Sequence, residues 1–225
     1  MTPVTRGRFI TFEGGEGAGK STQVRRLAER LRGLGEVVVT REPGGSPGAE
    51  AIRALLVNGP VERWSPISET LLMYAARRDH IERVIGPALA RGAWVVCDRF
   101  FDSTRAYQGA AGGAPAGLLK GLETEVVGEL VPDLTLILDL PVAVGLARAT
   151  QRTKNGGGKT GRGQPEGRFE AKGVEFHERL RAAFLDIAAR EPDRCRVIDA
   201  DAGMDVVTER IAAAVAARWG ELGHE

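Results

Sequence analysis

The 225-residue sequence predicts an α/β fold, a doubly wound parallel sheet of five strands with helices on both faces. Five short, continuous apolar runs have the composition of strands that are covered on both sides. Stretches with the 3.6-residue apolar period of a helix separate these runs, and consecutive parallel strands need such crossovers. A chain of this length suits one domain, taken here as residues 1–225.

The individual elements follow from local patterns. The expected strands cover residues 9–13, 37–40, 94–97, 134–138 and 196–198. The first helix is expected to begin directly after the glycine-rich segment 14–21, and further helices are expected near 46–58, 66–91, 115–129, 141–152, 168–190 and 203–218. The helix over 66–91 has clear boundaries, with Ser65 as N-cap, Pro66 at its first position and Gly92 after its end. Pro87 is expected to bend its last turns.

The glycine-rich segment carries the most specific signal. Residues 14–21, Gly-Gly-Glu-Gly-Ala-Gly-Lys-Ser, fit the pattern G-x-x-x-x-G-K-[ST] between the first strand and the first helix. In such a P-loop the glycines let backbone N–H groups converge on an anion, and the helix N-terminus adds its positive dipole end. We expect Lys20 to reach the β- and γ-phosphates from a solvent-facing loop, and the Ser21 hydroxyl to ligate Mg²⁺. The sequence therefore predicts a nucleoside triphosphate site in a P-loop NTPase-like fold.

Composition narrows the location and the partners. Lys and Arg number 31 against 30 Asp and Glu, so the net charge of +1 gives no general attraction for nucleic acids or membranes. Cys97 and Cys195 are expected to be small buried residues, not a disulfide or a metal pair. The apolar runs are shorter than the ~18 residues of a membrane span, and no apolar segment follows the charges in residues 1–8. We therefore expect a cytoplasmic protein with no nucleic-acid or membrane partner.

Arginines gather where the second and third strands end. Residues 40–45, Thr-Arg-Glu-Pro-Gly-Gly, follow the second strand and lead to a helix with Arg53, while residues 98–109 follow the third strand. The long helix adds Arg77. Because open α/β sheets bind ligands beyond the carboxyl ends of their strands, we expect a second anion site beside the P-loop.

One segment departs from the pattern of alternating strands and helices. Residues 152–168 are rich in glycine and positive charge and have no apolar period. Between two helices of a phosphate-binding protein this composition is typical of a mobile lid, placed here at about 148–170. Arg152, Arg162 and Arg168 could then bring guanidinium groups to phosphates, whereas a solvated surface loop is the alternative.

Four segments together resemble the thymidylate kinase family. They are Phe-Glu-Gly-Gly-Glu-Gly-Ala-Gly-Lys-Ser-Thr (12–22), Arg-Glu-Pro-Gly-Gly (41–45), Asp-Arg-Phe (98–100) and Ala-Tyr-Gln-Gly (106–109). The resemblance implies transfer of the γ-phosphate of ATP, with Mg²⁺, to dTMP, giving dTDP for DNA precursor synthesis. It also implies a homodimer. Gly17 resembles the bacterial branch, which has glycine at this position and places its catalytic arginines in the lid.

The resemblance further implies roles for residues at matching positions. ATP is expected to bind the P-loop residues Gly14, Gly15, Glu16, Gly17, Ala18, Gly19, Lys20, Ser21 and Thr22. For dTMP, the phosphate is expected to contact Arg53 and Arg99, and the sugar hydroxyl is expected to lie near Glu16. The thymine carbonyl is expected to contact Arg77, and the base edge Thr104 and Gln108. Met73 is also expected to contact dTMP. The expected catalytic residues are Lys20, Arg99, Arg168 and Arg152, and the expected magnesium positions are Ser21 and Asp98. The family usually has an aromatic residue at the position of Met73, so either Met73 or Tyr74 is expected to cover the thymine ring.

Two other functions remain open at this point. In a deoxynucleoside kinase, Glu42 would be the base that removes a proton from a 5′-hydroxyl. A P-loop switch would bind nucleotide without transferring phosphate. Three further polar residues are interpreted as structural: Asp139 as a helix cap, His177 as a satisfied core histidine, and His80 as structural or exposed.

Overall fold

The computed structural model describes residues 6–60, 62–154 and 172–220 and contains the predicted parallel sheet. Its five strands lie in the order β2-β3-β1-β4-β5, and every neighbouring pair is parallel. The strands are β1 (Arg8–Glu13), β2 (Val37–Arg41), β3 (Trp94–Asp98), β4 (Leu134–Asp139) and β5 (Cys195–Asp199). All five predicted strands are therefore confirmed, to within one residue at each end.

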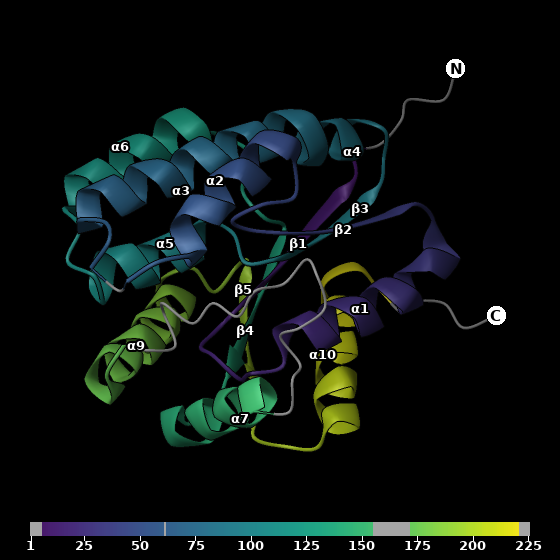
Figure 1. Cartoon of the computed structure of the whole chain (residues 1–225). Coiled ribbons are helices and arrows are strands. Elements are labelled where there is room, and N and C mark those ends of the chain that lie inside the picture. The colour runs from purple at the N-terminus through teal and green to yellow at the C-terminus, as the bar shows by residue number, and fades with distance from the viewer. Residues whose placement is uncertain (1–5, 61, 155–171, 221–225) are drawn as a thin grey trace.

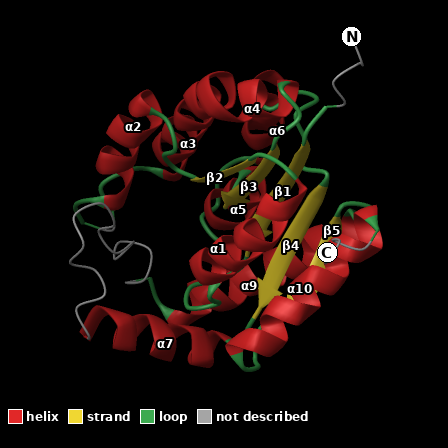
Figure 2. Cartoon of the chain, turned by 90° about the vertical axis from the view of Figure 1, so that its right-hand side faces the viewer, coloured by secondary structure: helices red, strands yellow, loops and turns green. Residues whose placement is uncertain are grey.

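Helices cover both faces of the sheet (Figures 1 and 2). They are α1 (Lys20–Leu31), α2 (Pro47–Val57), α3 (Pro66–His80), α4 (Gly86–Ala90), α5 (Phe101–Thr104), α6 (Ala116–Val126), α7 (Val142–Lys154), α9 (Val174–Arg190) and α10 (Met204–Trp219). A short 3₁₀ turn, η1 (Arg32–Leu34), extends α1. The doubly wound arrangement predicted from the sequence is confirmed.

Consecutive strand residues point into different cores. Ile10 and Val96 pack on the face covered by α1 and α10. Their neighbours Phe9 and Val95 pack on the opposite face, against α3, α4 and α6. A third cluster joins β4 to α9. This two-sided burial is the reason that the strands are continuously apolar in the sequence.

The long helix predicted over 66–91 consists of three consecutive helical segments. The Ser65 side chain accepts a hydrogen bond from the Ser68 amide at the start of α3, as an N-cap does. A π-helical turn, η2 (Ile81–Ile85), then precedes α4, which contains Pro87. Proline cannot donate to the preceding turn, so the irregular hydrogen bonding lies where the sequence predicted a bend. Gly92 ends the helix with a φ of 86°.

One short helix was not predicted, and one predicted helix begins later than expected. Residues 101–110, expected only to lie at the edge of the sheet, form α5 and the π-helical turn η3 (Arg105–Ala110). This short helix lacks the long apolar period from which helices were predicted. The helix expected from residue 168 begins at Val174, with Gly173 as its N-cap. Most of the predicted lid, from residue 155 to residue 170, lies outside the described residues.

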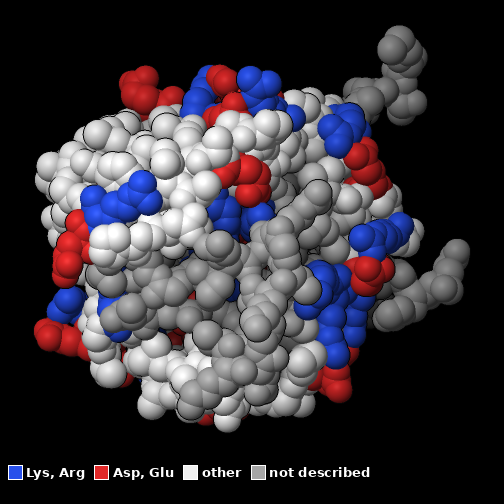
Figure 3. Space-filling model, viewed as in Figure 1, with Lys and Arg blue, Asp and Glu red and all other residues white. Residues whose placement is uncertain are grey.

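The surface carries both charges. Acidic and basic side chains alternate around the visible face, and most of the area over α3 and α6 has neither (Figure 3). Both cysteines are buried and unpaired, as predicted. Among the described helices, none combines the length and the apolar character of a membrane span.

Candidate active site

The predicted P-loop turns from β1 into α1 at the carboxyl edge of the sheet. The Lys20 ammonium donates hydrogen bonds to the carbonyl oxygens of Gly14, at 3.0 Å, and Gly15, at 2.7 Å. The Lys20 residue is only 7% exposed, so the expectation of a solvent-facing lysine was wrong. Its charge is held inside the loop, where it fixes the backbone that surrounds a phosphate site.

Gly17 of the P-loop and Gly145 of α7 are required by close backbone contacts. A Cβ atom on Gly17, whose φ is +70°, would lie 2.1 Å from the carbonyl oxygen of Gly145 in α7. A Cβ atom on Gly145 would in turn lie 2.5 Å from the carbonyl oxygen of Glu16. The P-loop therefore rests directly on the backbone of α7, and a side chain at position 17 does not fit this arrangement.

Ser21 and Asp98, which the resemblance suggests as magnesium positions, lie in direct contact beside the P-loop. The Ser21 hydroxyl, at the start of α1, donates to Asp98 Oδ2, at the end of β3, over 2.6 Å. One hydroxyl and one carboxylate are the oxygen donors that Mg²⁺ uses together with substrate phosphates. The pair fits a magnesium ion that nucleotide phosphates complete. Among the described residues no group of three or more His, Cys, Asp or Glu forms a separate metal site.

Arg99 connects the P-loop to the neighbouring pocket. Its backbone has a φ of 70°, which is rare for a residue with a side chain. One guanidinium nitrogen donates to the Gly14 carbonyl at 3.1 Å, and the other donates to Glu16 Oε1 at 2.9 Å. The Tyr107 hydroxyl donates to the same Glu16 oxygen at 2.7 Å, and the guanidinium lies over the Tyr107 ring. Glu16 and Arg99, predicted separately as substrate residues, are thus direct partners.

The buried carboxyl group of Glu13 holds the backbone that follows Arg99. Glu13 is the last residue of β1, and its carboxyl group accepts hydrogen bonds from the Phe100 amide at 2.8 Å and the Ser103 hydroxyl at 2.6 Å. Burial, with a further contribution from the charge of Asp102, raises the pKa of Glu13 from 4.5 to about 7. The carboxyl group holds the first turn of α5 beside Arg99.

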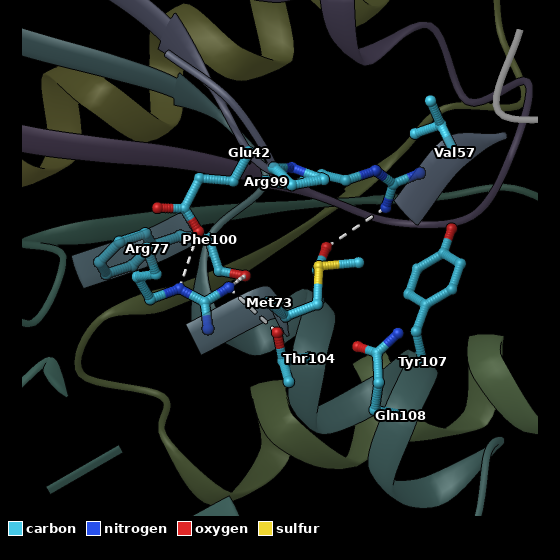
Figure 4. A pocket seen from close by; sticks show the side chains of 11 residues that line it. Glu42, Val57, Met73, Arg77, Arg99, Phe100, Thr104, Tyr107 and Gln108 are labelled. Carbon is cyan, nitrogen blue, oxygen red and sulfur yellow. Dashed lines mark hydrogen bonds and ion pairs between the residues drawn. The ribbon is translucent and has the colours of Figure 1, made fainter. Parts of the chain in front are cut away.

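A hollow of about 420 Å³, open to solvent, lies next to Arg99. We call it the acceptor pocket; its lining includes Met73, Arg77, Arg99, Thr104 and Gln108, all predicted for the acceptor nucleotide. Figure 4 shows these side chains, with Arg77 hydrogen-bonded to Glu42 and Thr104. The helices α3 and α5 and the turn η3 supply four of the five residues, and Arg99 follows the last residue of β3. The structure therefore brings most of the predicted acceptor residues together.

Arg77 is the most constrained residue of the acceptor pocket. Its Nε donates to Glu42 Oε2 at 2.7 Å, and its Nη2 donates to the Phe100 carbonyl and to Thr104 Oγ1 at 3.1 and 3.0 Å. Its Nη1 is buried and has no hydrogen-bond partner among the described residues. One nitrogen of the buried guanidinium is thus unsatisfied among the described residues.

Glu42 has no free oxygen for base catalysis. Its Oε2 accepts from Arg77, and its Oε1 is 3.0 Å from His80 Nδ1. A base that removes a proton from a 5′-hydroxyl needs an accessible oxygen, and Glu42 is only 4% exposed. The geometry therefore disfavours the deoxynucleoside kinase alternative.

The other residues predicted to contact the acceptor nucleotide differ in where they lie. Arg53 lies beside the pocket and donates to the Pro43 carbonyl at 2.7 Å. Gln108 donates its amide to Glu69 at 2.8 Å. Tyr74 is packed in the core with Phe9 and Val95, so the alternative in which Tyr74 covers the ring was wrong, whereas Met73 lines the pocket.

Three residues interpreted as structural also have defined positions. Asp139 does not cap the helix but forms an ion pair with Arg181 at 2.7 and 2.8 Å. His177 is buried, yet its Nε2 has no hydrogen-bond partner among the described residues, so it is not a satisfied histidine. His80 is fully buried.

The predicted lid arginines are not placed. Arg162 and Arg168 lie outside the described residues, and the backbone of Arg152 belongs to α7.

Sequence reasoning missed several residues that shape the site. Gly145 has no motif signal, because its contact with the P-loop joins elements far apart in the chain. Glu13 and Tyr107 lie inside two of the segments that resemble the family, but nothing in the sequence predicts their contacts. Glu42 was considered only as a base, although its position after β2 and an arginine-bearing helix nearby are compatible with an ion pair.

Three comparisons with known proteins agree. The sequence profile described as thymidylate kinase matches residues 12–211. The chain is 66% identical, over 96% of its length and 100% of the relative, to the thymidylate kinase of Caulobacter vibrioides, and 57% identical, over 92% and 87%, to that of Afipia carboxidovorans. The crystal structure of thymidylate kinase from Ehrlichia chaffeensis aligns with a TM-score of 0.74 at 33% identity, covering 93% of this chain and 99% of that one.

Proposed function

Because this chain belongs to the thymidylate kinase family, we propose that it transfers the γ-phosphate of ATP to dTMP and forms dTDP. The observation that carries the proposal is the position of Arg99. It lines the acceptor pocket while it donates to Gly14 and Glu16 of the P-loop. A donor phosphate on the loop and an acceptor phosphate in the pocket would meet at this side chain.

The chemistry requires positioning and positive charge. The phosphate of dTMP is already ionised at neutral pH, so its oxygen attacks without a general base, in agreement with the engaged carboxylate of Glu42. Two unit charges at ~4 Å repel by about 4 kcal/mol at an effective dielectric constant of ~20. Lys20 and the P-loop amides offset this repulsion on ATP, and Arg53 and Arg99 offset it on dTMP. Ser21 and Asp98 would hold Mg²⁺, which supplies further neutralisation of the phosphates when it is bound.

Base recognition follows from the donors in the acceptor pocket. The unpartnered Nη1 of Arg77 donates to a thymine carbonyl and has no capacity to accept from the amino group of cytosine. Thr104 and Gln108 complete the base edge, and the Met73 side chain covers the ring. Glu16 and Tyr107 lie toward the sugar.

The lid completes the donor site in this proposal. Gly17 leaves the P-loop without an arginine of its own, and the contact with Gly145 leaves no room for one. The charge on the transferring phosphoryl group therefore requires a cation from residues 148–170, with Arg168 first and Arg152 and Arg162 second. This is the arrangement of the bacterial branch that the sequence resembles.

The assembly and location belong to the same proposal. We infer a homodimer formed through α2 and α3, which expose Leu55, Ile67 and Leu71. The two unpaired cysteines suit the reducing cytoplasm, where we place the enzyme.

A coupled assay for ADP tests the activity. The chain is incubated with ATP and Mg²⁺ and with dTMP, dUMP, dCMP or thymidine, and a reaction without acceptor is the control. We expect turnover with dTMP, weaker turnover with dUMP and none above background with dCMP or thymidine. Turnover with thymidine alone would support the deoxynucleoside kinase alternative, and binding of ATP without transfer to any acceptor would support a switch.

A further inference from the structure

A chain of hydrogen bonds connects the end of β2 to the acceptor pocket through buried side chains. Thr40 Oγ1 lies 2.6 Å from His80 Nε2, and His80 Nδ1 lies 3.0 Å from Glu42 Oε1. The other Glu42 oxygen accepts from Arg77 Nε at 2.7 Å. His80 itself does not line the acceptor pocket. Among the described residues, the His80 side chain makes polar contacts with Thr40 and Glu42 alone.

The orientation of each member follows from its neighbour. A carboxylate oxygen only accepts, so His80 Nδ1 carries the hydrogen that bonds Glu42. The Glu42 carboxylate then faces Arg77 Nε with its second oxygen. Because a guanidinium group is planar and rigid, fixing Nε and Nη2 also fixes the direction of the unpartnered Nη1.

Packing prevents the His80 ring from turning away from Thr40 and Glu42. Gly45 has a φ of +88°, and a Cβ atom at that position would lie 2.4 Å from both His80 Nε2 and Thr40 Oγ1. The loop after β2 therefore closes directly over the histidine–threonine contact. His80 and Arg77 lie one turn apart on the same helix, so the carboxylate of Glu42 reaches both of them.

We propose that His80 is a positioning residue for base recognition: by holding Glu42, it sets the guanidinium of Arg77 in the orientation that donates to the thymine carbonyl. The proposal rests on the function proposed above. Because His80 lies outside the lining of the acceptor pocket, its effect is confined to the binding of the acceptor base through Glu42 and Arg77.

Two substitutions separate this role from a merely structural one. In His80→Asn the side-chain amide can occupy the place of Nδ1 and still donate to Glu42, but the contact with Thr40 is lost. In His80→Gln the amide reaches the place of Nε2 near Thr40, and the donor to Glu42 is lost. Gln is closer to His in volume, so loss of packing alone predicts that Asn is the more damaging change.

Steady-state kinetics with varied dTMP, dUMP and ATP provide the test. For His80→Gln we expect the KM for dTMP and for dUMP, which share the carbonyl, to rise roughly three- to tenfold. The kcat and the KM for ATP should change less than about twofold, because the P-loop is untouched. For His80→Asn we expect the KM for dTMP to stay within about twofold of the wild-type value. A larger rise in the KM for dTMP in His80→Asn than in His80→Gln would overturn the proposal. Equal changes in the KM for ATP and the KM for dTMP would also overturn it.

Substitutions outside His80 provide matched controls. Thr40→Val removes the hydroxyl beside His80 Nε2 but leaves the Nδ1 donor to Glu42, so the KM for dTMP should stay within about twofold of the wild-type value, as in His80→Asn. Ser46→Ala removes another buried hydroxyl, which donates to Asp79 at 2.6 Å and not to Thr40, His80 or Glu42 among the described residues, and should leave the KM unchanged. Absence of dTMP turnover in the wild-type chain would refute the proposed function, whereas wild-type turnover with unaltered KM in His80→Gln would refute only the role of His80.

Discussion

Met73 lies on the wall of the acceptor pocket at the position where the family usually has an aromatic ring. A thioether covers a base face through dispersion, whereas a stacked ring adds roughly 0.5–1.5 kcal/mol. We therefore expect Met73→Phe to lower the KM for dTMP by up to about fivefold. Met73→Ala should raise it about tenfold, because the apolar contact is lost. Met204→Ala, in an exposed methionine of α10, is the control in the same kinetic assay. Unchanged KM in both Met73 variants would show that another residue covers the base.

The buried carboxyl of Glu13 makes stability depend on pH. Its pKa of about 7 in the folded chain is above the ordinary 4.5, so the folded state binds the proton more tightly than the unfolded state. The stabilising contribution is complete below pH 4.5 and is lost as the pH rises through 7. In this window the free energy of unfolding should fall by at most about 1.4 kcal/mol per pH unit for one proton.

Glu13→Gln should remove this part of the pH dependence, because the amide does not titrate. Urea unfolding of both proteins between pH 4.5 and 7.5 measures the difference in slope. Glu125→Gln, at an exposed position of α6, controls for the loss of a surface charge. Parallel curves for the wild type and Glu13→Gln would contradict the assignment.

The contact between α7 and the P-loop leaves no space for an additional side-chain atom at Gly17 or Gly145. Alanine normally stabilises a helix relative to glycine, but a Cβ atom on Gly145 would lie 2.5 Å from the Glu16 carbonyl oxygen. Gly145→Ala should therefore displace the P-loop and lower kcat/KM for ATP about 10- to 100-fold. Gly121→Ala in α6 is the matched control, since among the described residues no atom outside the adjoining helix backbone lies within 4 Å of its added Cβ atom. That variant should gain about 0.5–1 kcal/mol of stability and keep its activity. Equal activity of the two variants would show that the P-loop adjusts freely.

The lid segment provides a second prediction at this scale. An arginine that contacts the phosphoryl group only in the transition state lowers kcat when it is removed and leaves KM nearly unchanged. We expect Arg168→Ala to lower kcat about 10³-fold or more, and Arg152→Ala or Arg162→Ala to lower it less. Single-turnover kinetics with saturating ATP and dTMP measure the chemical step. Normal rates in all three variants would make the segment a passive loop.

Across the whole molecule, the elements with a local sequence pattern were predicted, and the contacts between distant elements were not. The five strands and the P-loop were predictable because each depends on a local pattern, an apolar run or a glycine spacing. Phe9 and Ile10 illustrate the reason, since neighbours that serve opposite cores must both be apolar. The short helix α5 and the contact of Gly17 with Gly145 were not predictable, because they depend on elements that meet only after folding. Lys20 shows the same limit: its type and position follow from the motif, whereas its burial depends on how the loop closes around it.

The assembly of the whole molecule can be tested on the exposed apolar face of α2 and α3. Ile67 and Leu71 are each 47% exposed and lie one turn apart on α3, and Leu55 of α2 is 41% exposed. Contiguous exposed apolar side chains favour an interface, and a C2 dimer would bury the same patch from both copies. We expect the wild type to sediment with twice the 24.0 kDa mass of one chain.

A charge in this patch should separate the copies, because it would be repeated across the symmetric interface and desolvated there. Leu71→Glu is therefore expected to sediment as a monomer at micromolar concentration and to keep its fold, as circular dichroism would verify. Val206→Glu, at a position of 49% exposure on α10, is the matched control and should remain dimeric. A monomeric wild type would show that no such dimer forms. A Leu71→Glu dimer as tight as the wild type would place the interface elsewhere. In the second case, the same experiment on Leu55→Glu would show whether α2 alone carries the contact.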